Sequence, residues 1–202
     1  MISGIRADAL VEPAQTRIPV GVRKARMSDI APLLELINGY AARGIMLPRT
    51  EFELSESMRD FVVAESEGRL VGCGALHFYS PTTAEVRSLA VAEDAKTHGV
   101  GRRVIDAIIE EAFEYSLDAI FVFTYVPEFF RKMGFGEVER GALPLKAWKD
   151  CLRCPKFQGC DEIAMMRVLR PEHWALSSQK WGNIPSASEG TETVLLPVIR
   201  AV

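Results

Sequence analysis

Residues 88–112, SLAVAEDAKTHGVGRRVIDAIIEEA, constrain the fold of this chain more than any other stretch. They predict a buried strand, a loop with Gly99 and Gly101, and an amphipathic helix. The first turn of a helix carries unpaired backbone N–H groups and the positive end of the helix dipole, and both favour a phosphate group. Glycine lets the backbone approach such a ligand closely, and Arg102 and Arg103 add positive charge at the same place.

The loop over residues 96–101, KTHGVG, differs from two well-known phosphate-binding glycine loops. The third glycine of the dinucleotide pattern G-x-G-x-x-G is missing, and no Gly-Lys-Ser/Thr follows as in a P-loop. A plain glycine-containing turn before a helix is the competing interpretation. The spacing alone does not separate the two.

Length and composition predict one globular domain with tails. The chain has 202 residues, of which 48% are hydrophobic. We expect an N-terminal arm over residues 1–19, a folded domain over 20–170 and a C-terminal tail over 171–202. The formal charge of −3 and the lack of a long basic run argue against nucleic acid as a partner.

The sequence shows no targeting signal and few cysteines, and both features indicate a cytoplasmic protein. Charged residues interrupt every apolar run, so no segment is expected to span a membrane. Arg6, Asp8 and Glu12 interrupt the N-terminus before any apolar core, so no signal peptide is expected. Four cysteines at this length do not suggest a secreted disulfide scaffold, and reduced thiols are expected.

The remaining pattern mixes strands and helices. Ser28 is expected to cap a first helix, and Thr50-Glu51-Phe52-Glu53 has the form of a capping box that starts a second. Strands are predicted at 21–25, 61–65, 70–79, 84–91, 119–125, 136–140 and 162–169.

The strand over residues 84–91 has an imperfect alternation of polar and apolar residues. A β-bulge near Ser88 would change which face the following residues take. A strand, a crossover helix and another strand then follow from residue 84 to residue 125, and this order predicts a parallel pair. Gly72 and Gly74, on the preceding strand, suit close packing of a neighbouring element or a bulge.

This order of elements resembles the GNAT family of acetyl-CoA-dependent N-acetyltransferases over residues 22–169. The family signature Gln/Arg-x-x-Gly-x-Gly/Ala appears as KTHGVG, with Lys96 in its first position, and an aromatic segment of the FYEKLGF type appears as FFRKMGF at 129–135. The resemblance implies an α+β fold with a mixed, mostly antiparallel central sheet. It also implies a parallel pair at the cofactor cleft and helices on both faces.

Within the family, the chain looks most like the acetyltransferase domains of N-acetylglutamate synthases. The segments that carry this likeness are GIMLPRTEFEL, AEVRSLAV, IFVFTYVPEFFRKMGF and ALPLKAWKD. A short form without the amino-acid kinase-like domain of the long synthases is expected. The implied reaction is acetyl transfer from acetyl-CoA to the α-amine of L-glutamate, the first step of arginine biosynthesis.

The resemblance implies a set of cofactor-binding positions for acetyl-CoA. The pantetheine arm would pair with the backbone of Leu89, Ala90 and Val91, where a backbone N–H could polarise the thioester carbonyl. Phe130 occupies the position at which many members carry a Tyr that protonates the departing thiolate. The pyrophosphate would sit on the loop residues Lys96, Thr97, His98, Gly99, Val100, Gly101 and Arg102.

Three residues are candidates for proton transfer. Glu85 is the first candidate for the base that takes a proton from the amine, because it lies upstream on the strand beside the thioester. His77 is the second, and a packed strand histidine is its more ordinary interpretation. Because Phe130 cannot donate a proton, Tyr125 is expected to protonate the thiolate, unless Tyr125 is a core aromatic and water does so.

The implied substrate is an acidic amino acid, and cations should bind it. Arg49 matches an arginine of the substrate loop of the synthases, and Arg87 lies nearby on the strand. Lys156 or Arg153 could contact the side chain of the substrate. Solvated surface cations are the alternative for each. The alternative substrates are glutamine and another small amine, and the alternative function is a non-catalytic acyl-CoA sensor. A homodimer is left open.

The cysteines need a separate interpretation. Cys151, Cys154 and Cys160 form C-x2-C-x5-C, whose first spacing suits two thiolates on one metal ion such as zinc, with the third close enough to join. Redox control or ordinary reduced thiols are the alternatives. Cys73 is expected to be a small buried strand residue.

Overall fold

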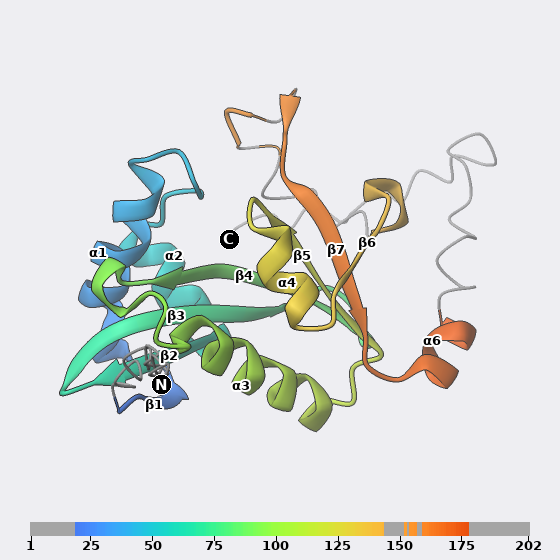
Figure 1. Cartoon of the computed structure of the whole chain (residues 1–202), viewed down its shortest axis with the longest axis horizontal. Helices are drawn as coiled ribbons and strands as arrows, with labels where there is room; N and C mark the ends of the chain where they lie inside the picture. The colour runs from blue at the N-terminus through green and yellow to red at the C-terminus, as the bar shows by residue number, and fades with distance from the viewer. Residues whose placement is uncertain (1–18, 144–151, 153, 157–158, 178–202) are drawn as a thin grey trace, which may run out of the picture.

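The computed structural model describes residues 19–143, 152, 154–156 and 159–177. The strands in this part of the chain form one sheet in the order β1-β2-β3-β4-β5-β7-β6 (Figure 1). They are β1 (Gly21–Lys24), β2 (Phe61–Ser66), β3 (Arg69–Phe78), β4 (Thr83–Val91), β5 (Ala119–Thr124), β6 (Gly136–Glu137) and β7 (Ile163–Val168). β4 and β5 run parallel, whereas the other neighbouring pairs are antiparallel. The predicted mixed sheet is confirmed.

Helices cover both faces of the sheet, as predicted. One hydrophobic core joins α1 (Ile30–Ala41) and α2 (Glu51–Ser57) to β2 and β3. A second core joins α3 (Val100–Glu114) and α4 (Pro127–Lys132) to the opposite face, and both helices lie in front of the sheet in Figure 1. Short turns of 3-10 helix are η1 (Met27–Asp29), η2 (Met58–Asp60), η3 (Glu93–Ala95) and η4 (Arg140–Ala142).

The helix α3 packs very closely on β3 at two glycines. A Cβ atom at Gly72 would lie 2.7 Å from Val100 Cγ1, and one at Gly74 would lie 2.8 Å from Val104 Cγ1. Both distances are too short for real carbon contacts, so a larger residue at either position would force the β3–α3 contact to shift. The close packing that the two glycines predict is confirmed, and it fixes where α3 begins.

A β-bulge divides β4, as the broken alternation predicts. Ala75 of β3 pairs with Arg87, and Cys73 pairs with Ala90, so two steps along β3 oppose three along β4. Ser88 has a left-handed backbone, with φ +54°. The parallel pairing with β5 covers only Thr83 to Glu85, although β4 continues to Val91. The two strands therefore separate beyond the bulge.

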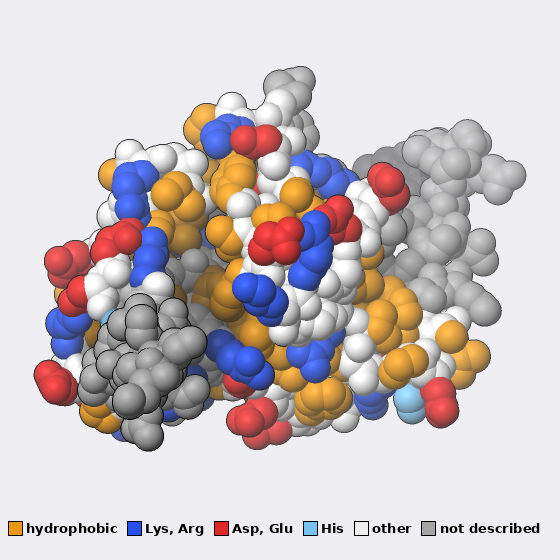
Figure 2. All heavy atoms as spheres, in the orientation of Figure 1, with side chains coloured by type: hydrophobic (Ala, Val, Ile, Leu, Met, Phe, Trp, Pro, Cys, Tyr) orange, Lys and Arg blue, Asp and Glu red, His pale blue; other side chains and the backbone are white. Residues whose placement is uncertain are grey.

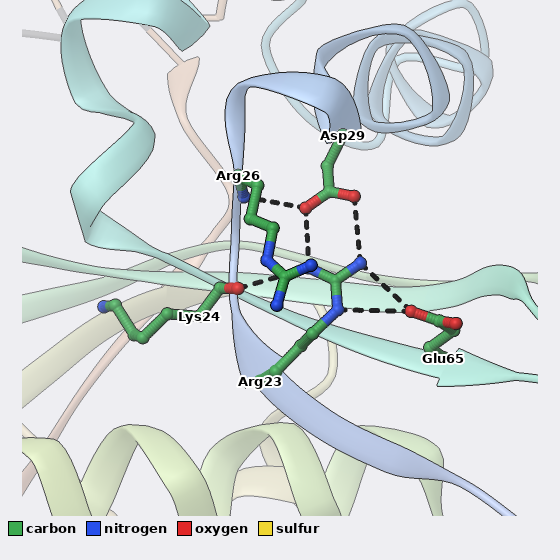
Figure 3. A network of polar contacts seen from close by, with 5 residues as sticks. All are labelled: Arg23, Lys24, Arg26, Asp29 and Glu65. Carbon is green, nitrogen blue, oxygen red and sulfur yellow. Dashed lines mark hydrogen bonds and ion pairs between the residues drawn. The ribbon is translucent and has the colours of Figure 1, made fainter.

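The N-terminal end of α1 is fixed by a charged network rather than by the predicted cap. Ser28 lies inside η1, so its prediction as the helix cap is wrong; the cap residue is Asp29. Its carboxylate accepts the backbone N–H of Arg26 at 2.7 Å and bonds from Arg23 at 2.7 and 3.0 Å, and Arg23 also reaches Glu65 at 3.0 Å (Figure 3). These bonds hold the pKa of Asp29 below its usual range and tie α1 to β1 and β2.

The ends of the fold differ in part from the predictions. The strand predicted at 136–140 is reduced to the two residues of β6, since η4 begins at Arg140. The region after residue 170, predicted as a tail, begins with α6 (Pro171–Ser177). Residues 1–18 and 178–202, most of the predicted arm and tail, lie outside the described residues. Among the helices described, none is long and apolar enough to cross a bilayer.

Candidate active site

A pocket of about 390 Å³ opens where β4 and β5 separate. Residues 85–89 of β4 form one wall, and residues 122–126, at the end of β5, form the other. The loop between α1 and α2, residues 44–49, closes one side, and residues 154–156, 160 and 162 close another. A volume of this size suits a small ligand or the reacting end of a larger one.

Charged side chains converge on this pocket from segments far apart in the sequence. Its lining includes two acidic residues, Glu85 and Glu162, and four basic residues: Arg49, Arg87, Arg140 and Lys156. The surface over α4 differs, since Figure 2 shows charges of both signs mixed there and Arg131 pairs with Glu128 and Glu137. An excess of cations around a concave, partly apolar pocket favours an anionic ligand.

Glu85 is the carboxylate best placed to accept a proton inside the pocket. It is 9% exposed and is the last residue of β4 that pairs with β5. Glu85 therefore belongs to the wall at which the two strands begin to diverge. A buried carboxylate beside an amine can act as a general base, directly or through water.

His77 is opposite Glu85 in the strand register, but it does not line the pocket. Its Nδ1 atom lies 2.6 Å from Asp60 Oδ2, and its ring stands edge-on to Tyr79. Arg87 Nη2 lies 3.7 Å from the same Asp60 oxygen. The structure thus places His77 beside the pocket, hydrogen-bonded to a carboxylate, whereas Arg87 reaches both Asp60 and the pocket.

Tyr125 lies directly after β5 and lines the pocket beside a lysine. Lys156 Nζ donates to Tyr125 Oη at 3.1 Å and lies 3.6 Å from Asp161. Burial raises the pKa of Tyr125, and the bond from Lys156 opposes that rise. The hydroxyl is therefore protonated at neutral pH and has a cation beside it. Arg153, the alternative to Lys156, lies outside the described residues.

Phe130 both lines the pocket and belongs to the core. It is 2% exposed, and its ring packs edge-on against Phe129 and Phe135, with centroids 5.1 and 5.2 Å away. Its ring can offer only apolar contact to a ligand. Phe130 itself cannot donate a proton, whereas the neighbouring Tyr125 carries a hydroxyl in the same pocket.

The predicted phosphate loop lies at the start of α3, beyond the end of β4. Gly99 precedes the helix with φ +77°, and Thr97 also has a positive φ, +69°. Gly99 has no side chain to bond the first N–H groups of α3, which leaves them for a ligand. A Cβ atom at Gly101 would lie 3.6 Å from Val91 Cγ2, so this helix start abuts the end of β4.

The charged residues around this loop are already paired. Lys96 lies 2.9 Å from Glu93, and Arg102 lies 3.7 Å from Asp106. His98 Nδ1 lies 2.9 Å from the carbonyl oxygen of Lys96. Of the predicted cofactor residues, Leu89 and Phe130 line the pocket, while the loop, Ala90 and Val91 do not. The backbone N–H groups are therefore the main feature this loop offers to a phosphate.

Arg140 is a pocket residue that the sequence analysis missed. Its guanidinium donates to the carbonyl oxygen of Cys160 at 3.1 Å and to that of Glu162, and it lies 5.9 Å from the centroid of Phe123. Arg140 therefore ties residues 160–162 to the pocket. Burial raises the pKa of the neighbouring Glu162 carboxyl. The position lies within a predicted strand, so no local pattern marks it.

The structure separates the cysteines into two kinds. Cys73 is fully buried, as predicted, and burial raises the pKa of its thiol to about 12. Cys154 and Cys160 are half-buried and both line the pocket. Cys151 lies outside the described residues, and the residues described contain no group of three His, Cys, Asp or Glu that could hold a metal ion. The three-cysteine metal site stays a prediction.

Comparison with known proteins gives a consistent result. The model of the acetyltransferase (GNAT) family matches residues 33–135. An uncharacterized N-acetyltransferase of Chlorobaculum tepidum is 41% identical over 148 residues, which cover 73% of this chain and 96% of that protein. An amino-acid acetyltransferase of Mycobacterium tuberculosis is 37% identical over 121 residues, 58% of this chain and 69% of that protein.

A solved structure of a similar protein contains bound ligands. N-acetylglutamate synthase from Neisseria gonorrhoeae, in complex with coenzyme A and N-acetyl-glutamate, superposes with a TM-score of 0.69 at 28% identity. The match covers 75% of this chain and 35% of that one. The family match, the fold and the pocket between β4 and β5 agree: the chain belongs to the acetyltransferase (GNAT) family and is an acetyl-CoA-dependent N-acetyltransferase.

Proposed function

We propose that the enzyme transfers the acetyl group of acetyl-CoA to the α-amine of L-glutamate and so forms N-acetyl-L-glutamate, as in the first step of arginine biosynthesis. The observation that carries this proposal is the charge of the pocket, whose lining has four cationic residues and two acidic ones, Glu85 and Glu162. A dicarboxylate amino acid gives such a pocket two anionic groups to bind. The relatives named amino-acid acetyltransferase and N-acetylglutamate synthase support the same substrate class.

Acetyl-CoA supplies the acetyl group as a reactive thioester, and the chain supplies its binding site. The backbone of Leu89, Ala90 and Val91 belongs to the part of β4 beyond the parallel pairing with β5. In the proposal this backbone pairs with the pantetheine arm, as an added strand would. The N–H groups of residues 98–102 bind the pyrophosphate at the positive end of α3.

Proton transfer is assigned to two side chains on opposite walls. An amino-acid amine is mostly protonated at neutral pH, so Glu85 accepts a proton from it, directly or through water. Tyr125 donates a proton to the departing sulfur, and the ammonium of Lys156, 3.1 Å from its hydroxyl, stabilises the phenolate that remains. The ammonium loses two protons on the way to the amide, one before the attack and one from the tetrahedral intermediate, and both pass through Glu85 to solvent in turn. Solvent returns one proton to Tyr125, so the reaction yields coenzyme A as the thiol and releases one net proton.

Carboxylate binding is assigned to the cations. Arg49 and Arg87 lie on different walls of the pocket, and a guanidinium can bond a carboxylate through two parallel N–H groups. Lys156 and Arg140 line another part of the pocket, together with Cys160 and Glu162, and are suited to the side-chain carboxylate. A contact between Arg153 and the substrate side chain stays a prediction.

The test is product formation with L-glutamate and acetyl-CoA, followed by mass spectrometry and by release of free thiol. We expect stoichiometric N-acetyl-L-glutamate and coenzyme A. Arg49→Ala should raise the KM for glutamate by about tenfold or more, because a hydrogen bond to a charged group is lost, and leave the KM for acetyl-CoA unchanged. Acetylation only of amines without an α-carboxylate would overturn the proposal.

A further inference from the structure

The wall that carries Arg49 is a loop whose position must be set by contacts outside the loop. All of residues 44–49 line the pocket. The loop leaves α1 through Gly44, which has φ +69°, and ends at Arg49, just before the cap residue of α2. The direction of the Arg49 side chain therefore depends on how the backbone at this end is held.

Asn38, in the last turn of α1, holds that backbone through both ends of its side-chain amide. Asn38 Nδ2 donates to the carbonyl oxygen of Arg49 at 2.9 Å, and Asn38 Oδ1 accepts the N–H of Arg49 at 2.8 Å. One side chain thus satisfies both backbone groups of a single residue, as a neighbouring strand would. Asn38 is half-buried beside the fully buried Ile37.

Only an amide of this length can make both bonds. The reverse orientation of the amide would set its NH₂ group against the N–H of Arg49, so the two bonds fix its orientation. An Asp would keep the acceptor and lose the donor. Asn is also a poorer helix former than Ala, Leu or Glu, and the two bonds to Arg49 offset that disadvantage within α1.

Thr50, the residue after Arg49, is also held by two hydrogen bonds, which come from the first turn of α2. Thr50 Oγ1 accepts the N–H of Glu53 at 3.2 Å, and the Glu53 carboxylate accepts the N–H of Thr50 at 2.9 Å. This is the predicted capping box, now confirmed. Arg49 therefore lies between two fixed points, the amide of Asn38 and the first turn of α2. A cation on such a backbone loses less freedom when it binds an anion.

We propose that Asn38 is a positioning residue that sets the affinity for the acceptor amino acid by fixing the backbone of Arg49. The proposal deepens the proposed function, because it takes Arg49 as a ligand of the substrate carboxylate. Asn38 does not line the pocket, so it acts through Arg49 and not by touching the substrate.

The kinetic test compares Asn38→Ala and Asn38→Asp with the parent enzyme. We expect Asn38→Ala to raise the KM for the amino acid about tenfold, with kcat and the KM for acetyl-CoA within twofold of the parent. Asn38→Asp keeps the acceptor but sets a carboxylate oxygen against the carbonyl oxygen of Arg49, so its increase should be at least as large. Glu35→Ala, exposed on the same helix, is the matched control and should change neither KM.

A double-mutant cycle separates positioning from general damage to α1. In an Arg49→Ala background, Asn38→Ala should add less than a twofold change in the amino-acid KM, because the two residues act as one unit. An equal effect of Asn38→Ala in both backgrounds, or an equal increase in the KM for acetyl-CoA, would show a structural role only and would overturn the proposal.

Amide hydrogen exchange tests the same contact without any substrate. Asn38→Ala should increase the exchange rate of the Arg49 N–H at least tenfold, while the amides of β2 and β3 keep theirs. Unchanged exchange at Arg49 overturns the proposal. This measurement does not depend on which amine is acetylated. If glutamate is not a substrate but exchange rises as expected, the proposed function fails and the clamp on Arg49 stands.

Discussion

Gly72→Ala tests whether close packing between β3 and α3 positions the start of α3. The new methyl carbon would lie 2.7 Å from Val100 Cγ1, and Val100 is the first residue of α3. Carbon atoms prefer a separation of 3.5–4.0 Å, so the Val100 side chain, and the helix start with it, is expected to move by about 1 Å. Both residues are buried, and overpacking of this kind costs about 1–3 kcal/mol of folding free energy.

The movement should also affect the site, because the N–H groups at the start of α3 are the proposed pyrophosphate ligands. We expect a Tm lower by about 2–12 °C, since 1 kcal/mol corresponds to about 2–4 °C at this size. The KM for acetyl-CoA should rise several-fold, with little change in the KM for the amino acid. Thermal unfolding and initial rates of thiol release measure the two effects.

Two further variants make this prediction sharp. A Cβ atom at Gly21 of β1 would meet nothing within 4 Å, so Gly21→Ala should change neither quantity. Gly72→Ala combined with Val100→Ala removes the clash and should recover the KM for acetyl-CoA. The reasoning is refuted if Gly72→Ala keeps the parent Tm and acetyl-CoA KM, or if Gly21→Ala lowers the Tm as much.

Three other predictions follow from single groups. Glu85→Gln should lower kcat by about 10²–10⁴-fold and leave the KM for acetyl-CoA unchanged; a normal kcat would exclude Glu85 as the base. A thiol reagent at pH 8 should label Cys154 and Cys160 but not Cys73, whose burial raises its pKa to about 12; mass mapping after digestion reads this out. Burial raises the pKa of Glu162, so the folded protein holds that proton more tightly than the unfolded chain, and stability is lost as the pH rises above the ordinary glutamate pKa of about 4.3. Glu162→Gln should therefore have a higher Tm than the parent at pH 7 and no advantage at pH 4, and the reverse order would contradict the pKa direction.

Features that depend on nearby residues were predictable from the sequence. The capping box at Thr50 and the bulge at Ser88 both follow from residues within a few positions, and both are present. The helix cap at Ser28 was predicted wrongly because the cap position is set by a network around Asp29. In this network Arg23 bonds both Asp29 and Glu65, and Glu65 lies far along the chain. Local patterns cannot report such a partner.

The same limit explains which site residues the sequence missed. Arg140 reaches the pocket through carbonyl groups 20 and 22 residues away, and Asn38 reaches a loop 11 residues further on. Neither belongs to a motif. His77, by contrast, was named from its position on β3, and the structure places it against Asp60 beside the pocket rather than in its lining. Whether His77 faces the pocket depends on the side-chain directions along the bulged strands. These directions are set by the pairing of the strands in the sheet and not by the residues next to His77.

The excess of cationic residues in the pocket lining should make the enzyme select a dicarboxylate amino acid. The most direct measurement is the ratio of kcat/KM for L-glutamate to that for L-glutamine, with acetyl-CoA saturating and thiol release as the readout. The two substrates differ by one negative charge at nearly the same shape. The account predicts a ratio of about ten or more, equivalent to at least about 1.4 kcal/mol of transition-state binding. A ratio of one or less would contradict it.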